Sequence, residues 1–110
     1  MAAPTTILFS GFLQPGTSRF YSFTMTSAGT VTAMLGSVEQ AGGVPVSGRL
    51  ELGLGRPAGT GCAVTASQLT LAALVPQLTQ ETPAGTHCVR VLDVDRLPSA
   101  VTFTVRVIRP

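Results

Sequence analysis

Near the end of the chain the sequence reads Val101-Thr102-Phe103-Thr104-Val105-Arg106-Val107-Ile108, in which apolar and polar residues alternate. Successive side chains of a β-strand point to opposite faces, so this pattern predicts a strand whose odd-numbered residues share one buried face. Valine, phenylalanine and threonine are all frequent in strands. We therefore expect a half-buried strand at this position.

The same period of two recurs in the upstream sequence, with turn signals between the segments. The pair Pro15-Gly16 predicts a tight turn, because proline presets φ at the second turn position and glycine accepts positive φ at the third. We expect glycine-rich loops at Glu39–Gly48 and Gly55–Gly61. The segment Cys62–Leu78 has a weaker pattern, which is compatible with strands or with a short helix. The remaining predicted strands are Thr5–Leu13, Arg19–Thr26, Thr30–Val38, Arg49–Leu54 and Thr86–Val94.

These segments together predict the fold class. No segment has a convincing helical period, no linker or repeat divides the chain, and 110 residues suit one domain spanning 1–110. Seven or eight short strands separated by Gly/Pro turns are typical of an all-β, two-sheet antiparallel β-sandwich. The predicted core between the sheets contains Phe23, Leu35, Leu52, Val89, Val91, Phe103 and Val105.

The composition excludes two classes of partner. Charged residues make up 11% of the chain and the net charge is +2, without a cluster of basic residues, which argues against nucleic-acid binding. No apolar run approaches the roughly 18 residues that a membrane helix needs, so we expect no membrane insertion. The N-terminal residues lack the basic and apolar regions of a signal peptide, so we expect a leader that was removed or another route of export.

The two cysteines, Cys62 and Cys88, could form a disulfide or remain two buried thiols. We favour the disulfide, because both follow Gly-Thr segments in β-like sequence and no metal or redox motif competes. A zinc site with His87 would lack a fourth ligand, and adjacent side chains of a strand point to opposite faces.

Few residues in this chain suggest chemistry. Asp93 and Asp95 could form a metal site or a glycosidase pair, but we favour a solvated strand end with Arg90 or Arg96 as charge partner. Two carboxylates are too few for calcium. His87 has no identifiable catalytic neighbours, so we expect a packed or edge-exposed imidazole rather than a base. We predict no catalytic residue, no cofactor, no metal and no enzymatic activity.

The order of the strand and turn segments resembles the bacterial pre-peptidase C-terminal domain, which is appended to secreted proteases and other exported proteins. The resemblance implies a jelly-roll-like β-sandwich. Some relatives bind calcium through acidic residues near the N-terminus, but no Asp or Glu precedes Glu39 here, so that site is not carried over. The matching segments are Phe9–Leu13, Pro15-Gly16, Arg19–Thr24, Ala28–Leu35, Ala84–Val91 and Val101–Val105.

Two functions remain as hypotheses. The first is a non-enzymatic assembly protein on a virion, such as a phage decoration protein, or in an extracellular filament, because a surface with few charges is easily covered by protein neighbours or further copies of itself. The second is a secreted module that binds carbohydrate or matrix protein, as the resemblance implies. We expect assembly contacts in Ala2–Ile7, Glu39–Ser47 and Gly55–Gly61. A candidate contact surface, unless these residues only maintain solubility, comprises Arg19, Tyr21, Arg49, Arg56 and Arg90.

Overall fold

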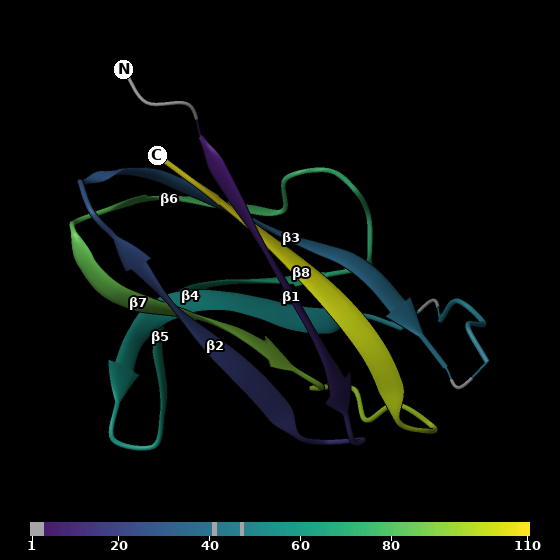
Figure 1. Ribbon diagram of the computed structural model, residues 1–110. Coiled ribbons are helices and arrows are strands. Elements are labelled where there is room, and N and C mark those ends of the chain that lie inside the picture. The colour runs from purple at the N-terminus through teal and green to yellow at the C-terminus, as the bar shows by residue number, and fades with distance from the viewer. Residues whose placement is uncertain (1–3, 41, 47) are drawn as a thin grey trace.

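The computed structural model describes residues 4–40, 42–46 and 48–110, and its regular structure consists of β-strands. Figure 1 shows these strands crossing the molecule in two layers. Within the described ranges, no helix is long and apolar enough to cross a membrane. The strands are β1 (Thr5–Leu13), β2 (Ser18–Met25), β3 (Gly29–Glu39), β4 (Leu50–Ala58), β5 (Gly61–Thr70), β6 (Leu78–Thr82), β7 (Gly85–Leu92) and β8 (Val101–Arg109).

The eight strands form two antiparallel sheets of four. The first sheet has the order β1-β8-β3-β6 and the second has the order β2-β7-β4-β5. The pairs β1–β8, β2–β7, β3–β6 and β4–β5 are nested, as if one long hairpin had been folded over itself, which is the arrangement of a jelly roll. The predicted all-β, two-sheet sandwich is therefore confirmed.

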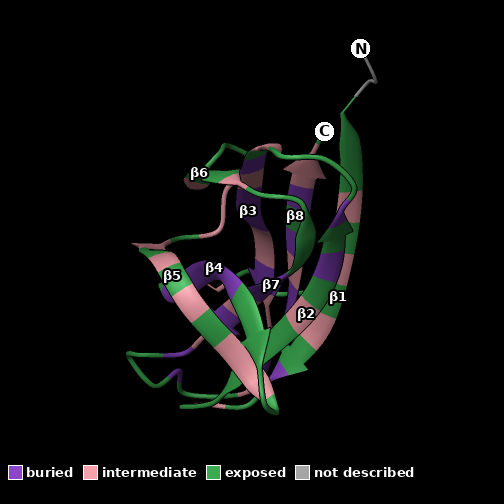
Figure 2. Ribbon diagram, turned by 90° about the vertical axis from the view of Figure 1, so that its left-hand side faces the viewer, coloured by how far each residue is buried: buried purple, intermediate pink, exposed green. Residues whose placement is uncertain are grey.

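The core lies between the two sheets, on the faces that the alternation predicted. Figure 2 shows the buried segments of the strands concentrated between the layers. All seven predicted core residues are at most 5% exposed, and Phe103 at 1% is the largest of the fully buried side chains. Complete burial of one such side chain contributes about 1.5–3 kcal/mol, so these residues supply much of the stability of the sandwich.

The predicted loop at Gly55–Gly61 is wrong. Strand β4 continues to Ala58 and β5 begins at Gly61, which leaves only a short turn between them. The register between the two strands shifts between Leu54 and Gly55, because Thr65 of β5 has no opposite residue on β4. Pro57 is tolerated because β4 pairs with β7 only up to Gly55, so the missing N–H breaks no bond on that side.

The weakly patterned segment forms two strands joined by a loop over residues 71–77. The side chain of Gln77 fastens this loop to β3: its Nε2 donates to the carbonyls of Ala73 and Leu35, and its Oε1 accepts from the Leu35 amide. The pairing of β3 with β6 ends at Ala33 and Leu78, so beyond that point the Gln77 amide group takes the place of a neighbouring strand at Leu35.

Candidate functional site

One lateral opening of the sandwich, between the edge strands β1 and β2, is closed by side chains. Three donors reach main-chain carbonyls of the edge strand in the opposite sheet, and we call this set the β1–β2 seam. Because each acceptor is part of the backbone, the bonds hold the two sheets together without depending on a second side chain. The donor–acceptor pairs are Tyr21 with Ser10, Arg19 with Phe12, and Arg109 with Thr24.

Tyr21 is the central residue of this seam. Its hydroxyl donates to the Ser10 carbonyl over 3.1 Å, and its ring stacks on Phe9 with centroids 4.9 Å apart. The fit requires a glycine at position 11, because a Cβ there would overlap the Tyr21 hydroxyl and lie 3.0 Å from Cζ of Phe103. Gly11 is thus required by the close approach of Tyr21.

The opposite opening, between β5 and β6, contains a cavity of about 240 Å³. Phe23 and Leu54 contribute apolar walls, and Gln80 contributes an amide. Arg56 is the cation and Glu81 the carboxylate among the residues that line it. The two openings therefore differ: one is bridged by hydrogen bonds, and the other is hollow with polar groups at its wall.

His87 lines the same cavity and is 5% exposed. Its Nε2 lies 2.8 Å from the carbonyl oxygen of Pro83. A carbonyl can only accept, so Nε2 carries the proton and donates, which leaves Nδ1 as an acceptor when the ring is neutral. The ring also lies 6.0 Å from the ring of Phe23. This is the packed imidazole that the sequence predicts.

Asp93 departs from its prediction, because it is buried rather than solvated, with 3% exposure. Its Oδ2 accepts hydrogen bonds from the amides of Gly16 and Leu97 at 2.8 and 2.7 Å. The Asp93 amide in turn donates to the carbonyl of Thr17. The carboxylate therefore joins the β1–β2 turn to the β7–β8 connection, and it has neither Arg90 nor Arg96 as a partner.

The structure distributes the five residues of the candidate contact surface rather than gathering them on one face. Arg19 and Tyr21 belong to the β1–β2 seam. Arg49 lies next to β4 and forms an exposed ion pair with Asp95 at 3.6 Å. Such an exposed pair contributes little to stability.

The other two arginines lie on different parts of the second sheet. Arg90 projects from the outer face of β7 and forms a half-buried ion pair with Glu51 at 2.8 Å. Arg56 lines the cavity between β5 and β6. Of the five residues, Arg19 and Tyr21 are the two that lie close together.

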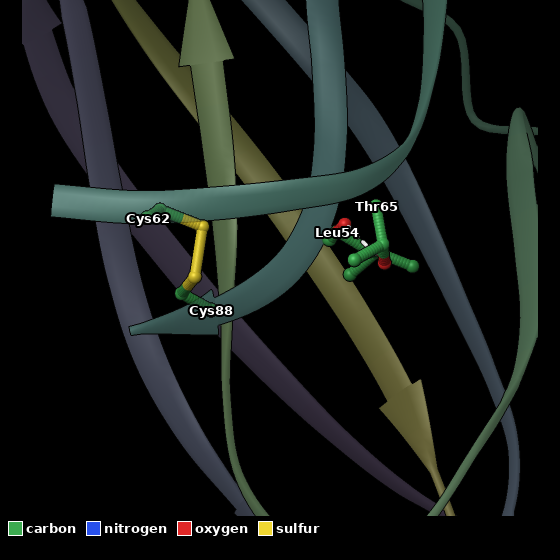
Figure 3. The surroundings of a disulfide bond; sticks show 4 residues. All are labelled: Leu54, Cys62, Thr65 and Cys88. Carbon is green, nitrogen blue, oxygen red and sulfur yellow. Dashed lines mark hydrogen bonds between the residues drawn. A yellow bond between two sulfur atoms is a disulfide. The ribbon is translucent and has the colours of Figure 1, made fainter. Parts of the chain in front are cut away.

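The predicted disulfide between Cys62 and Cys88 is confirmed, with a Cα–Cα distance of 6.0 Å. Figure 3 shows it joining β5 to β7 across the outer face of the second sheet. These strands are separated by β4 in the sheet order, so the β4–β5 hairpin must curl over β7. Gly53 and Gly55 permit this close packing, since a Cβ at Gly53 would lie 2.9 Å from Val64.

The outer face of the first sheet is a feature that the sequence analysis did not identify. Leu8 and Phe12 project from it and are 60% and 45% exposed. Strands β1, β3 and β8 are described in full, and the charged side chains that project outward from them are Arg106 and Glu39. The face also contains a depression of about 540 Å³ between these three strands. The sequence signal for this surface was the presence of apolar residues at even-numbered positions of Thr5–Leu13, on the face opposite to the core.

The predicted contact segments lie only in part within the described residues. Ala2 and Ala3 lie outside the described residues, and Thr5–Ile7 forms the start of β1. The segment after Glu39 returns to pair at Pro45, and Ala41 and Ser47 lie outside the described residues. In the described part of the chain, no three His, Cys, Asp or Glu side chains gather as metal ligands would.

No protein-family model matches the sequence, and none of the curated proteins matches it. The resemblance to the pre-peptidase C-terminal domain therefore stays a prediction from strand and turn patterns. The structure is similar to the crystal structure of Yersinia pseudotuberculosis-derived mitogen, with a TM-score of 0.70 and 14% sequence identity. The match covers 98% of this chain and 88% of that chain. At this identity the likeness shows the fold alone: an antiparallel β-sandwich of two sheets.

Proposed function

We propose that this protein is a non-enzymatic structural subunit, which docks through the outer face of its first sheet onto a larger particle or extracellular assembly. The observation that carries the proposal is the chemistry of that face. It presents Leu8 and Phe12 to solvent, and its other outward side chains are mainly threonine and serine. Large exposed apolar side chains gathered on one face are typical of interaction sites.

The low charge of this face favours burial against a partner. Removing a charged side chain from water costs several kcal/mol. Burial of leucine is favourable, and threonine is buried at little cost when its hydroxyl finds a hydrogen-bond partner. Glu39 is the charged residue among the described residues that line the depression between β1, β3 and β8, so a neighbour seated there meets a single carboxylate.

Two further observations support the proposal. Jelly-roll sandwiches recur in capsid proteins and lectins, although a fold does not by itself imply a function. The Cys62–Cys88 disulfide is suited to an oxidising compartment, such as the extracellular space or a particle surface.

The test is a matched pair of lysine substitutions. Thr102 is exposed on β8 between Phe12 and Glu39 and lines the depression of the outer face, whereas Ser22 is exposed on the second sheet. We expect Thr102→Lys to reduce co-sedimentation with particles or filaments from the source at least tenfold, and Ser22→Lys to leave it unchanged. Equal binding by both variants, or no binding by the wild-type protein, would refute docking through this face.

A second function, a secreted module that binds carbohydrate, is favoured by the cavity between β5 and β6. A small polyhydroxyl ligand could accept from Arg56, hydrogen-bond to the amide of Gln80, which shares the inner face of the first sheet with Val31, and pack an apolar ring face on Phe23. Titration of the labelled protein with simple sugars, followed by NMR, would show shifts of the cavity amides. Arg56→Ala should abolish these shifts and Arg49→Ala should preserve them, and a spectrum without shifts would exclude this function for the sugars used.

A further inference from the structure

Strand β1 is an edge strand of nine residues, with the sequence Thr-Thr-Ile-Leu-Phe-Ser-Gly-Phe-Leu. It contains no charged residue and no proline. Edge strands are usually protected by lysine, proline or a bulge, because their unpaired backbone groups can pair with another strand. The pairing of β1 with β8 is regular from Thr5 to Leu13, so no bulge interrupts this edge.

The hydrogen bonds of the β1–β2 seam show which backbone groups face the open side. The carbonyls of Ser10 and Phe12 accept from side chains of β2, so they point away from β8. The N–H and C=O groups of one strand residue point to the same side, and this direction alternates along the strand. The backbone groups of Thr6 and Leu8 therefore also face the open side.

The two halves of this edge differ in whether their outward backbone groups have hydrogen-bond partners. In the C-terminal half, Tyr21 and Arg19 occupy the carbonyls of Ser10 and Phe12. In the N-terminal half, the outward N–H and C=O groups of Thr6 and Leu8 have no partner among the described residues. The open part of the edge is therefore short and centred on Ile7.

We propose that the open half of β1 pairs antiparallel with the same segment of a second copy, about a two-fold axis at Ile7. In this register Thr6 of each copy lies opposite Leu8 of the other, and the two pairs exchange four backbone hydrogen bonds. The first sheets of two copies then form one continuous eight-stranded sheet. The inference rests on the proposed assembly role, but it concerns the edge of the sheet rather than its outer face.

Several features favour a second copy as the partner. The two-fold register is self-complementary, which is the geometry of most homodimers. The paired segments contain no charge, so like charges do not meet across the axis. Leu8, 60% exposed in the single chain, gains a threonine neighbour, and the half-buried Ile7 meets its own copy. The side chains of Tyr21 and Arg19 stop longer strands from pairing along the whole edge.

Proline substitutions test the edge directly. Leu8→Pro and Thr6→Pro each remove one outward N–H per copy, without removing a bond to β8. Ser22→Pro is the matched control: Thr24 uses its carbonyl on the open side of β2, so Ser22 also faces an open edge. Circular dichroism and thermal melting identify variants that fail to fold, and Thr6→Lys provides a second, milder perturbation of the same edge.

Sedimentation velocity over a concentration series measures the dimer. We expect a concentration-dependent dimer of the wild-type protein, a Kd raised at least tenfold by Leu8→Pro, Thr6→Pro and Thr6→Lys, and no change with Ser22→Pro. A wild-type protein that is monomeric at all concentrations, or a dimer that folded edge variants preserve, overturns the inference. Thr102→Lys separates the two proposals, because it should abolish docking on the particle and leave the edge dimer intact.

Discussion

Substitution of Gly11 by alanine provides the sharpest test of how the two sheets are joined. Gly11 lies on the inner side of β1, where the Tyr21 hydroxyl occupies the space that a Cβ would need. Alanine at this position must displace the Tyr21 ring or push β1 away from β2. Either movement breaks the hydrogen bond from Tyr21 to the Ser10 carbonyl and disturbs the stack on Phe9.

The cost follows from these contacts. The hydrogen bond contributes about 1 kcal/mol. The aromatic stack contributes about 0.5–1.5 kcal/mol, and overpacking adds about 1–3 kcal/mol of strain. The smaller conformational entropy of unfolded alanine offsets roughly 0.5–1 kcal/mol of this loss. We therefore expect Gly11→Ala to lower the free energy of unfolding by about 2–4 kcal/mol, mostly through the Tyr21 hydroxyl and its neighbours.

A double-mutant cycle in urea isolates the contribution of that hydroxyl. Tyr21→Phe alone removes only the hydrogen bond, so we expect a loss of about 1 kcal/mol. When Tyr21→Phe is combined with Gly11→Ala, the oxygen that clashes with the new methyl group is absent. The loss in the double variant should therefore be at least about 1 kcal/mol smaller than the sum of the single losses. Additivity to within about 0.5 kcal/mol would show that Gly11 is not required by Tyr21, and the explanation of the seam would fail.

Three further perturbations follow from the structure. Reduction of the Cys62–Cys88 bond, which spans 26 residues, should lower the free energy of unfolding by about 3.5 kcal/mol, and a change below about 1 kcal/mol between oxidised and reduced urea curves would contradict this. Asp93→Ala leaves two backbone amides without their carboxylate, so we expect a loss of about 2–4 kcal/mol, whereas a solvated Asp93 would show almost none. Phe103→Ala should cost about 3–5 kcal/mol in the same assay, and a loss below about 1 kcal/mol would mean that the buried face of β8 is wrongly assigned.

The local pattern of the sequence was sufficient for most strands and for the face that each one buries. Strand β1 has the predicted bounds, and the valines of β8 are buried where the alternation places them. Both results follow from a local rule, since a strand exposes successive residues to opposite sides. The Pro15-Gly16 turn is equally local, and Gly16 has the positive φ of 73° that the turn needs.

The bulges could not be predicted in this way. Gly55–Gly61 has the glycine- and proline-containing composition of a loop, and the bulge beside it arises on β5, where Thr65 has no opposite residue on β4. The segment is a strand nonetheless, because β5 pairs with it across the bulge and the Cys62–Cys88 bond holds the hairpin over β7. Partners from elsewhere in the chain override the local preference of glycine and proline.

The candidate sites depend on tertiary contacts in the same way. Asp93 has the sequence of a solvated turn, but the nested pairing of β1–β8 and β2–β7 brings it to the amide of Gly16, 77 residues away in sequence. Tyr21 and Arg56 could equally have lain on one surface, and the two sheets instead place them at opposite openings of the sandwich. Periodicity specifies the direction of a side chain from its own strand, whereas the neighbour that it meets depends on which strands the sheets bring together.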